Sequence, residues 1–431
     1  MLASAEEVLV LPDDVDFDRV GVDFAWTPTS AQLQRLATTL GALGPGAEVR
    51  LASLRHTALL AGPLGTATFR GPAGDDDVAW SGDTSFDLRW SAAEIAGART
   101  AVDLYFGAAR TERFTTLLAV DIDFPGDDGI LVYPRAGGLY VALSPGARWD
   151  GEARIAVAQG LVHRWIGGRL RLDPGGEGPP ERAMWFDVGV GRGIAREILV
   201  DLGVFGADDL LAEIHRLVGE LRTSPLRDQS NDAVAAAAAA GDDDAKALLV
   251  ARGALFAARL DAVLRGLGAP LRARMRALFE GAALRGARVV TIADLIQWID
   301  HELVDAGAGE LQRVLAGSLT LPRALLGECF TAAPRTYTRF DLGFDAARSQ
   351  AESPPTVRGV RPGGPAAKAG LREGEPLHSV VADRDDPEVP AEVVVERGGQ
   401  PTTIQYRPRG TSARGDGWRR RPGADPRLCP P

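Results

Sequence analysis

The spacing of apolar residues separates a strand-rich N-terminal third from a helical middle. Before residue 150, short β-branched or aromatic runs alternate with glycine, proline and aspartate, a pattern typical of strands and turns. The roughly sixty residues before Thr66 are too few for a β-sandwich of about 100 residues, so residues 1–65 are predicted to form a reduced β region. Strands are expected in the segments AEVRLASL (47–54), ALLAGPLGTATFRG (58–71), TAVDLYFG (100–107), FTTLLAVDIDF (114–124) and GILVYPRAGGLYVAL (129–143).

After residue 150 the apolar residues recur at helical spacing. We therefore predict one domain over residues 66–330, with strands to about residue 150 and helices beyond it. The alanine run in NDAVAAAAAAGDDDAK (231–246) is interrupted by glycine and three aspartates, so this segment is predicted to be a solvated connection. The expected helices lie in EARIAVAQGLVHRWIGGRL (152–170), VGRGIAREILVDLGV (190–204), ADDLLAEIHRLVGELR (207–222), DAKALLVARGALFAARLDAVLRGL (244–267) and TIADLIQWIDHELVDAG (291–307).

A separate small module is predicted from about Pro334. Short strand patterns surround one helical segment over residues 334–408, for example in TVRGVRPGGPAAKAGLREGEPLHSVVA (356–382). The remaining residues, 409–431, are rich in glycine, proline and arginine, and are predicted to be a disordered tail.

Composition narrows the possible partners and the location. The 431 residues carry a formal charge of -10, which argues against a nucleic-acid binder because such proteins normally present a basic surface. No signal peptide is evident at the start, and no apolar run approaches the 18 or so residues that a membrane helix needs. The compartment stays open, with the cytoplasm favoured. Because Cys429 lies in the predicted disordered tail, no bridge between Cys329 and Cys429 is expected.

The segment VAQGLVHRWIGG (157–168) has the outline of a zinc-peptidase helix. In the motif H-E-x-x-H, two histidines one helical turn apart bind the same zinc ion and the glutamate activates the bound water. Here only His163 is in place, because Gln159 and Gly160 stand at the other two positions.

Several further motifs resemble one metallopeptidase family in order and spacing. LVHRWIGGRLRL, AMWFDVGVGRGIAREILVDLGVF, SPLRD and LLVARGALFAARLDAVLR resemble the glycyl-aminopeptidase family of gluzincins, whose members read HE-x-x-H-x-W-N-G-x-R, then WF-x-EG-x-T-x-YY, then Y-x-RG. The resemblance covers about residues 100–405. It implies an α+β protein, with a thermolysin-like domain after an N-terminal β region and a C-terminal PDZ-like domain.

Most of the family's functional residues are replaced in this chain. The resemblance puts the first zinc histidine on Gln159, the general base on Gly160 and the second zinc histidine on His163. It puts the third zinc ligand on Val188 and the tyrosine that supports the transition state on Val250. Matches are confined to framework positions: Trp165, Arg169, Trp185, Phe186, Gly189, Arg252, Gly253, Asp261 and Arg265.

These replacements predict a non-catalytic peptidase homologue with no zinc and no other cofactor. Valine cannot coordinate metal, and loss of the general base removes a factor of roughly 10²–10⁴ in rate. The alternative is an active aminopeptidase with an altered metal site, in which His163 is joined by Asp187 or His215. A further pair, His301 and Asp305 in HELVD, is more typical of a solvated helix end.

The C-terminal module offers a candidate peptide groove. Asp341, Leu342, Gly343 and Phe344 resemble the PDZ loop whose backbone N–H groups receive a peptide carboxylate, and VRPGGPAAKAGLREGE (360–375) resembles the PDZ core. Such a domain accepts an extended peptide as an added strand. The expected partner is therefore a polypeptide or protein, bound in the former substrate cleft or in this groove, rather than nucleic acid or a membrane. A purely structural PDZ-like domain is the alternative.

Overall fold

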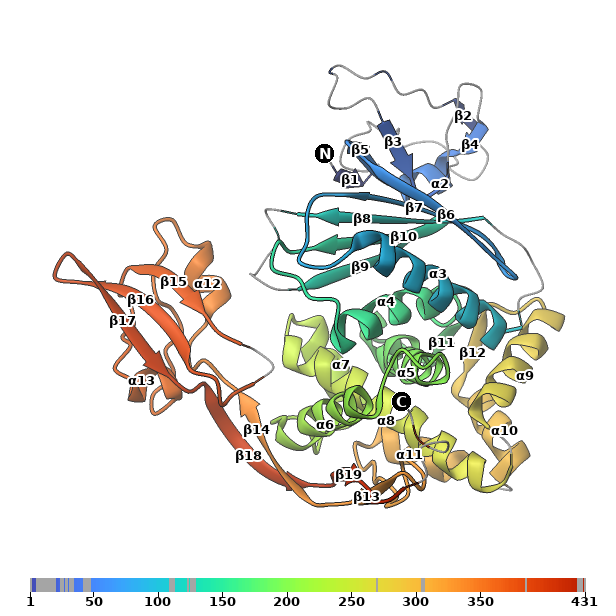
Figure 1. Cartoon of the computed structure of the whole chain (residues 1–431). Helices are drawn as coiled ribbons and strands as arrows, with labels where there is room; N and C mark the ends of the chain where they lie inside the picture. The colour runs from blue at the N-terminus through green and yellow to red at the C-terminus, as the bar shows by residue number, and fades with distance from the viewer. Residues whose placement is uncertain are drawn as a thin grey trace.

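The computed structural model describes residues 2–4, 21–23, 27, 30, 35–41, 48–107, 113–121, 124, 129–268, 270–303, 307–383, 386–424 and 429. Figure 1 shows a sheet region near the N-terminus, a helical body beside it, and a C-terminal β unit that extends from the body on two paired strands. The predicted combination of helices and strands is confirmed. Within the described residues, no helix is long and apolar enough to cross a membrane.

Two small antiparallel sheets occupy the described part of residues 1–65. β1 (Leu2–Ser4), β5 (Ala58–Gly62) and β3 (Arg35–Thr38) form one sheet with β5 in the centre. β2 (Gly21–Asp23) pairs with β4 (Glu48–Arg50) in the other. The strand predicted over residues 47–54 is shorter than expected, because α2 (Leu51–Arg55) begins directly after β4 and buries Leu51 and Leu54.

A mixed five-stranded sheet follows, in the order β6-β7-β8-β10-β9. β7 and β8 are parallel, as are β8 and β10, while the outer pairs are antiparallel. Parallel neighbours need a crossover connection, which α3 provides between β7 and β8. The bounds are β6 (Gly65–Gly71), β7 (Gly74–Ser81), α3 (Leu88–Tyr105), β8 (Phe114–Val120), β9 (Ile130–Arg135) and β10 (Gly138–Leu143).

The strand predicted over residues 100–107 is wrong, because most of this segment forms the last turns of α3. Buried Ile95, Ala98, Val102 and Tyr105 recur three or four residues apart and form one face of a helix. The segment TAVDLYFG contains only the end of this stripe, so its β-branched and aromatic residues resembled a strand.

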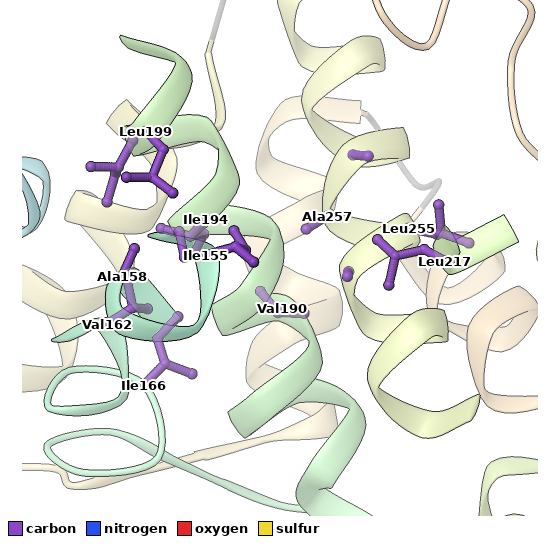
Figure 2. Packing of buried hydrophobic residues seen from close by; sticks show 14 of the residues in the cluster. Ile155, Ala158, Val162, Ile166, Val190, Ile194, Leu199, Leu217, Leu255 and Ala257 are labelled. Carbon is purple, nitrogen blue, oxygen red and sulfur yellow. The ribbon is translucent and has the colours of Figure 1, made fainter. Parts of the chain in front are cut away.

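The helical body is built around α8 (Asp243–Gly266), whose central turns are buried on all sides. Figure 2 shows part of the surrounding apolar cluster, in which Ile155, Ala158 and Val162 of α4 belong with Val190 and Ile194. The other elements are α4 (Gly151–His163), β11 (Arg171–Asp173), η2 (Pro180–Ala183), η3 (Trp185–Val190), α5 (Gly191–Asp201), α6 (Ala207–Thr223), α7 (Asn231–Ala239), α9 (Leu271–Leu284), β12 (Val289–Thr291), α10 (Ile292–Leu303) and α11 (Gly307–Leu315).

The prediction of a solvated connection over residues 231–246 is wrong. Residues 231–239 form α7, which begins at the cap residue Ser230 and buries Val234, Ala235 and Ala238. Small alanine side chains let α7 pack closely beside α8. Only the turn at Ala240–Asp242 separates the two helices.

The C-terminal β unit has a core of its own. β15 (Leu377–Val381), β16 (Ala391–Arg397) and β17 (Gln400–Tyr406) form an antiparallel sheet, which α12 (Ala346–Ala351) and α13 (Pro365–Lys368) accompany. β14 (Arg335–Phe340) and β18 (Arg409–Gly415) pair in the ribbon that leads back to the body in Figure 1. The buried core residues are Phe344, Val357, Ala366, Leu371, Leu377, Val393, Val395 and Ile404.

The prediction that residues 409–431 are disordered is wrong for most of the segment. Residues 409–415 form β18, and β19 (Trp418–Arg420) pairs with β13 (Phe330–Ala332). The Trp418 side chain is buried, and its indole N–H donates to the carbonyl of Arg323 at 2.9 Å. The arginines project from paired strands here, and composition alone does not show this pairing.

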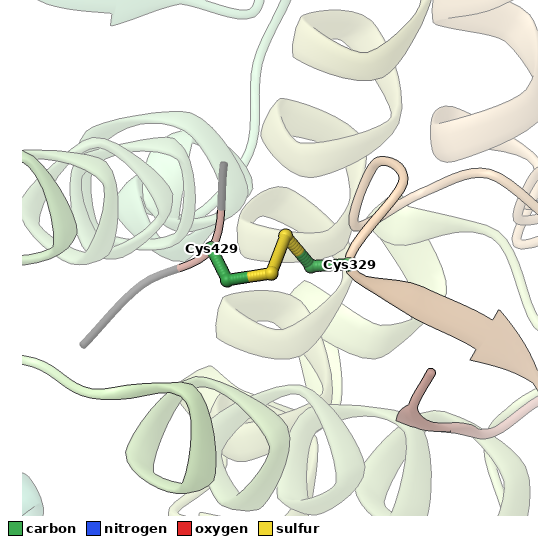
Figure 3. The surroundings of a disulfide bond; sticks show 2 residues. All are labelled: Cys329 and Cys429. Carbon is green, nitrogen blue, oxygen red and sulfur yellow. A yellow bond between two sulfur atoms is a disulfide. The ribbon is translucent and has the colours of Figure 1, made fainter. Parts of the chain in front are cut away.

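The prediction against a cysteine bridge is also wrong. Cys329 and Cys429 form a disulfide with a Cα–Cα distance of 5.4 Å (Figure 3). The β13–β19 pairing explains this contact, because it returns the chain to the residue that precedes β13. The Arg421 N–H also donates to the carbonyl of Cys329 at 2.8 Å.

Candidate functional site

Helix α4 holds three of the sequence-predicted site positions. It begins at the cap residue Asp150, whose carboxylate accepts from the Ala153 N–H at 3.2 Å. Gln159 and His163 lie one turn apart and are both half-buried, while Gly160 is buried. The amide of Gln159 and the imidazole of His163 therefore lie on the same face of α4.

An arginine, rather than a metal-ligating partner, approaches Gln159. Arg192 near the start of α5 donates from Nη1 to Gln159 Oε1 at 3.2 Å. Its guanidinium also forms a two-point pair with Glu213 of α6, at 2.7 Å from Nε and 2.9 Å from Nη2. Glu152, near the start of α4, accepts from Nη2 at 3.2 Å. A guanidinium that is paired with two carboxylates thus contacts the Gln159 side chain.

This network is strongly ionised despite its burial. Burial opposes the charge on Glu213, yet the guanidinium groups of Arg192 and Arg216 lower the pKa of Glu213 to about 2. Conversely, burial disfavours the charge on Arg192, and Glu213 raises the pKa of Arg192 above its ordinary value. Charge-assisted two-point pairs of this kind are among the stronger hydrogen-bonded contacts in proteins.

Gly160 lies directly beneath the edge of the five-stranded sheet. A Cβ atom at this position would lie 2.5 Å from Val132 Cγ1 and 3.1 Å from Leu139 Cδ1. Val132 belongs to β9 and Leu139 to β10, so two adjacent strands press on this turn of α4. The space for a glutamate side chain at position 160 is therefore filled by the sheet.

His163 is packed against the loop that follows α4. Gly167 has φ +92°, and a Cβ there would lie 2.5 Å from His163 Cε1. Burial and the charge of Arg171 lower the pKa of His163, while the backbone of Asp187 opposes this shift. The imidazole is consequently neutral at pH 7 and held by packing.

Asp187 and His215, the alternative metal ligands, each form other contacts. Burial raises the pKa of Asp187 to about 6, and its carboxylate accepts from the Leu172 N–H at 3.0 Å, which fixes β11. The Nε2 atom of His215 accepts from the Trp418 N–H at 3.1 Å, and Arg335 lies 3.0 Å from Nδ1. Burial and then Arg335 lower the pKa of His215 to about 4. His215 therefore serves the contact between α6 and the C-terminal strands.

The described ranges contain no group of three histidine, cysteine, aspartate or glutamate side chains placed to hold a metal ion. Val188 and Val250 lie near the crossing of η3 and α8, where a Cβ on Gly189 would lie 2.8 Å from the Val250 carbonyl oxygen. Both valines are half-buried and offer no ligand or acid. His301 is exposed on α10, and its partner Asp305 lies outside the described residues.

Arg252, one of the framework residues matched by the motifs, forms hydrogen bonds that stabilise the helical body. Arg252 is fully buried, and burial lowers its pKa to about 10. It donates to Asn231 Oδ1 at 2.7 Å and to the carbonyl oxygens of Arg227 and Gln229 at 2.9 and 2.8 Å. These bonds hold the segment before α7 against α8.

The loop of Asp341, Leu342, Gly343 and Phe344 is closed by its own contacts. Asp341 Oδ1 accepts from the Gly343 N–H at 2.7 Å and pairs with the Arg361 guanidinium. The Leu342 carbonyl accepts from the Tyr406 hydroxyl at 2.7 Å, and the Phe344 side chain is buried in the core of the unit. An internal carboxylate thus engages one of the N–H groups of the loop that the resemblance expects to receive a peptide carboxylate.

Sequence reasoning missed a pocket between α3, the end of α4 and α9. Its lining includes Arg99, Asp103, Arg164, Trp165 and Arg169, and its volume is about 320 Å³. Arg99 and Asp103 are four residues apart on α3 and form an ion pair at 2.9 Å. This i,i+4 spacing was the available signal, and assigning the end of α3 to a strand concealed it.

Comparison with solved structures finds chains with a similar fold. An aminopeptidase N family protein from Idiomarina loihiensis has a TM-score of 0.62 and 16% identity, over 88% of this chain and 74% of that one. An M1 zinc metallopeptidase from Deinococcus radiodurans has a TM-score of 0.43 and 15% identity, over 64% of this chain and 56% of that one. No protein-family model and no curated protein matches the chain. The first of these likenesses shows that the chain has the fold of an aminopeptidase N family protein.

Proposed function

We propose that this chain is a non-catalytic homologue of zinc aminopeptidases, of the glycyl-aminopeptidase type, that binds a polypeptide or protein partner. One observation carries the proposal: the Arg192 guanidinium is bonded to Gln159 where the family pattern has its first zinc histidine. Gln159 offers an amide in place of an imidazole, and its oxygen is already engaged by a guanidinium that Glu213 holds in place.

The position of the general base supports the same proposal. In the family pattern a glutamate follows the first histidine, and here Gly160 lets Val132 pack on α4. A carboxylate cannot enter that space unless β9 moves. With Val188 at the third ligand position, water activation by zinc lacks both the metal and the base.

The proposed partner site is the C-terminal unit, interpreted as PDZ-like. Its sheet has the order β15-β16-β17, so β15 and β17 are edge strands, and an edge can accept an extended peptide through main-chain hydrogen bonds. A peptide carboxylate would have to replace Asp341 at the Gly343 N–H and at Arg361. Peptide binding at the loop is therefore in competition with this internal carboxylate.

The absence of catalysis is tested by metal analysis together with an aminopeptidase assay. We expect the purified full chain to hold no stoichiometric zinc after exposure to ZnSO₄, and to release no p-nitroaniline from aminoacyl p-nitroanilides. Stoichiometric zinc and activity that disappear in His163→Ala, and persist in the matched variant His378→Ala, would overturn the proposal. His378 is a suitable control because it is exposed on β15, away from α4.

Partner binding is tested with a fluorescent library of extended decapeptides, each as a free acid and as a C-terminal amide. We expect selected free acids to bind, and Asp341→Ala to strengthen their binding at least threefold because the Gly343 N–H and Arg361 lose their internal partner. Asp386→Ala, in an exposed turn of the same unit, should change nothing. If no peptide binds wild type or Asp341→Ala, the unit has a structural role and the proposed partner site is wrong.

A further inference from the structure

The two chain segments that join the C-terminal β unit to the helical body are strongly basic. Residues 321–340 and 409–424 contain eight arginines and two acids, a net charge of +6, while the whole chain carries -10. The two segments lie together, because β13 pairs with β19 and β14 pairs with β18 (Figure 1). The charge of this junction is therefore opposite in sign to that of the whole chain.

Part of this charge is compensated within the chain. Acids outside the two segments neutralise two of the eight arginines, in the pairs Arg339–Asp244 and Arg409–Glu388. Asp416, one of the two acids of the segments, is itself paired with an outside arginine, at 2.7 Å from Arg222. Asp416 is therefore engaged and is not a counter-charge for the other arginines of the junction.

Four exposed arginines of the junction form no ion pair within the part of the chain that the structure describes. We refer to them as the arginine band, and they are Arg323, Arg414, Arg419 and Arg421. The second acid, Glu328, is exposed, and it precedes Cys329, whose carbonyl accepts from the Arg421 N–H at 2.8 Å. One carboxylate near one end of the band leaves an excess of positive charge along the rest of it.

Strand pairing directs the band into solvent. Trp418 is buried, so its neighbour Arg419 on β19 points to the other face of the strand. On β18, Arg414 follows Ala413, which lies opposite buried Tyr337. Arg414 therefore points to the face opposite Tyr337. Both guanidinium groups are accessible to a partner without any rearrangement of the chain.

The band is long and narrow. Arg414 and Arg419 are five residues apart, about 17 Å in an extended chain, and Arg421 lies about 7 Å further on. The ribbon that carries Arg414 has only two strands, β14 and β18, among the described residues. In an extended polypeptide, alternate side chains point to the same face about every 7 Å. A line of arginines at this spacing matches an extended chain with acidic side chains at alternate positions.

Two other classes of anionic partner have less support. Within the described residues, no exposed large apolar side chain lies in 321–340 or 409–424, so a lipid bilayer has no apolar anchor here. A nucleic acid is a long polyanion that would extend over the acidic remainder of the chain, which repels it. A short acidic segment of a polypeptide can contact the band alone.

We infer that the arginine band docks an acidic, extended segment of a polypeptide partner. Glutamate or aspartate side chains of this segment pair with the guanidinium groups of the band. Because exposed ion pairs are individually weak, the affinity depends on several of them acting together and falls as salt is added. This docking rests on the proposed function, since it takes the partner to be a polypeptide, and it adds a contact outside the Asp341 loop.

The test is fluorescence anisotropy of the full chain with a rhodamine-labelled, C-terminally amidated peptide of eight Ser-Glu repeats at 50 mM NaCl. We expect this peptide to bind, and a matched Ser-Gln peptide to bind at least tenfold more weakly. Raising NaCl to 300 mM should weaken binding at least fivefold. The triple variant Arg414→Gln, Arg419→Gln and Arg421→Gln should also weaken it at least tenfold.

A charge-matched control separates the band from the overall charge. The triple variant Arg70→Gln, Arg89→Gln and Arg288→Gln removes three exposed arginines elsewhere and should bind within about twofold of wild type. Thermal melting shows whether each variant is folded. Arg419→Gln alone should weaken binding about threefold, and it keeps the comparison valid if the triple variant of the band unfolds.

Equal binding by the two triple variants, or of the glutamate and glutamine peptides, would overturn the inference. Tighter binding of a 16-nucleotide oligothymidylate or of phosphatidylserine vesicles would do the same, because the partner would not be a polypeptide. Asp341→Ala should leave the binding unchanged, since an amidated peptide has no terminal carboxylate for that loop. Failure of the acidic peptide to bind wild type would therefore contradict the arginine band and leave the C-terminal groove to its own test.

Discussion

At the residue scale, two side chains outside the peptidase motif surround the motif positions Gln159 and Gly160. Arg192 supplies a positive charge beside Gln159, and Val132 fills the space above Gly160. The triple variant Gln159→His, Gly160→Glu and Val188→Glu restores the three motif residues. It still keeps Arg192 beside position 159 and Val132 beside position 160. The chemistry at this site depends on neighbours that lie more than twenty residues away in the sequence.

The contact of Gly160 with Val132 can be tested by adding one methyl group. In an open helix Gly→Ala stabilises by about 1 kcal/mol, but here we expect Gly160→Ala to destabilise the chain by about 1–2 kcal/mol through overpacking. In Gly160→Ala combined with Val132→Ala, the loss should be smaller than the sum of the two single changes. Urea unfolding provides the measurement.

Gly97→Ala is the matched control, because Gly97 lies in α3 with open space where its Cβ would be. It should stabilise the chain by up to about 1 kcal/mol. If Gly160→Ala behaves like Gly97→Ala, β9 does not press on α4.

The buried pair of Arg192 and Glu213 makes stability depend on acid pH. The pKa of Glu213 falls from 4.5 to about 2 on folding, so its contribution is complete above about pH 4.5 and is lost as the pH falls towards 2. The shift corresponds to about 3 kcal/mol. We expect urea unfolding of wild type to show this loss between pH 4.5 and 2.

In Glu213→Gln that pH-dependent loss should be absent, and stability at pH 7 should fall by about 3–5 kcal/mol because two arginines lose a buried counter-charge. Glu220→Gln, on the same helix, should keep the pH dependence of wild type. An unchanged acid profile in Glu213→Gln would show that Glu213 does not have a low pKa.

At the element scale, the body depends on how closely η3 and α5 approach α8. A Cβ on Gly253 would lie 1.7 Å from the Trp185 carbonyl oxygen, and one on Gly193 would lie 2.6 Å from Ala257 Cβ. Backbone therefore lies against backbone at this crossing. This close approach explains why positions 193 and 253 are occupied by glycine.

The crossing predicts a large difference between two glycines of α8. Gly253→Ala should destabilise the chain by about 3 kcal/mol or more, because the neighbouring atoms are backbone and cannot turn aside. Gly266→Ala, at the open end of the same helix, should lie between no effect and about 1 kcal/mol of stabilisation. Similar melting temperatures for the two variants would contradict the close approach.

At the scale of the whole molecule, the C-terminal segment from Trp418 to Cys429 is joined to the residues around Cys329. The β13–β19 pairing, buried Trp418 and the Cys329–Cys429 bridge all join residues about a hundred positions apart. A bridge of this kind is typical of proteins outside the reducing cytosol.

Reduction of this bridge should weaken the chain. The sequence separation is 100 residues, and loop closure of that length corresponds to as much as about 4.7 kcal/mol of stability. We expect wild type under non-reducing denaturing conditions to contain no thiol reactive towards Ellman's reagent, and to melt at a lower temperature after reduction. The double variant Cys329→Ser with Cys429→Ser should be insensitive to reductant, and two reactive thiols in unreduced wild type would rule out the bridge.

The sequence by itself determined the features that depend on local pattern. Short β-branched and aromatic runs indicated β8 and β10, and an apolar period of three to four indicated α4, α6 and α8. The order of the peptidase motifs indicated the aminopeptidase fold, which the comparison with solved structures supports. These inferences succeeded because side-chain periodicity and motif spacing are properties of neighbouring residues.

Only the tertiary structure decided the features that depend on distant neighbours. The arginine beside Gln159, the strand above Gly160, the bridge at Cys429 and the arginine-lined pocket each bring together residues from separate elements. Local pattern also failed at α3 and α7, where burial against other helices decided the conformation. Packing and charge pairing act through space, and a single sequence does not specify which of its residues will meet.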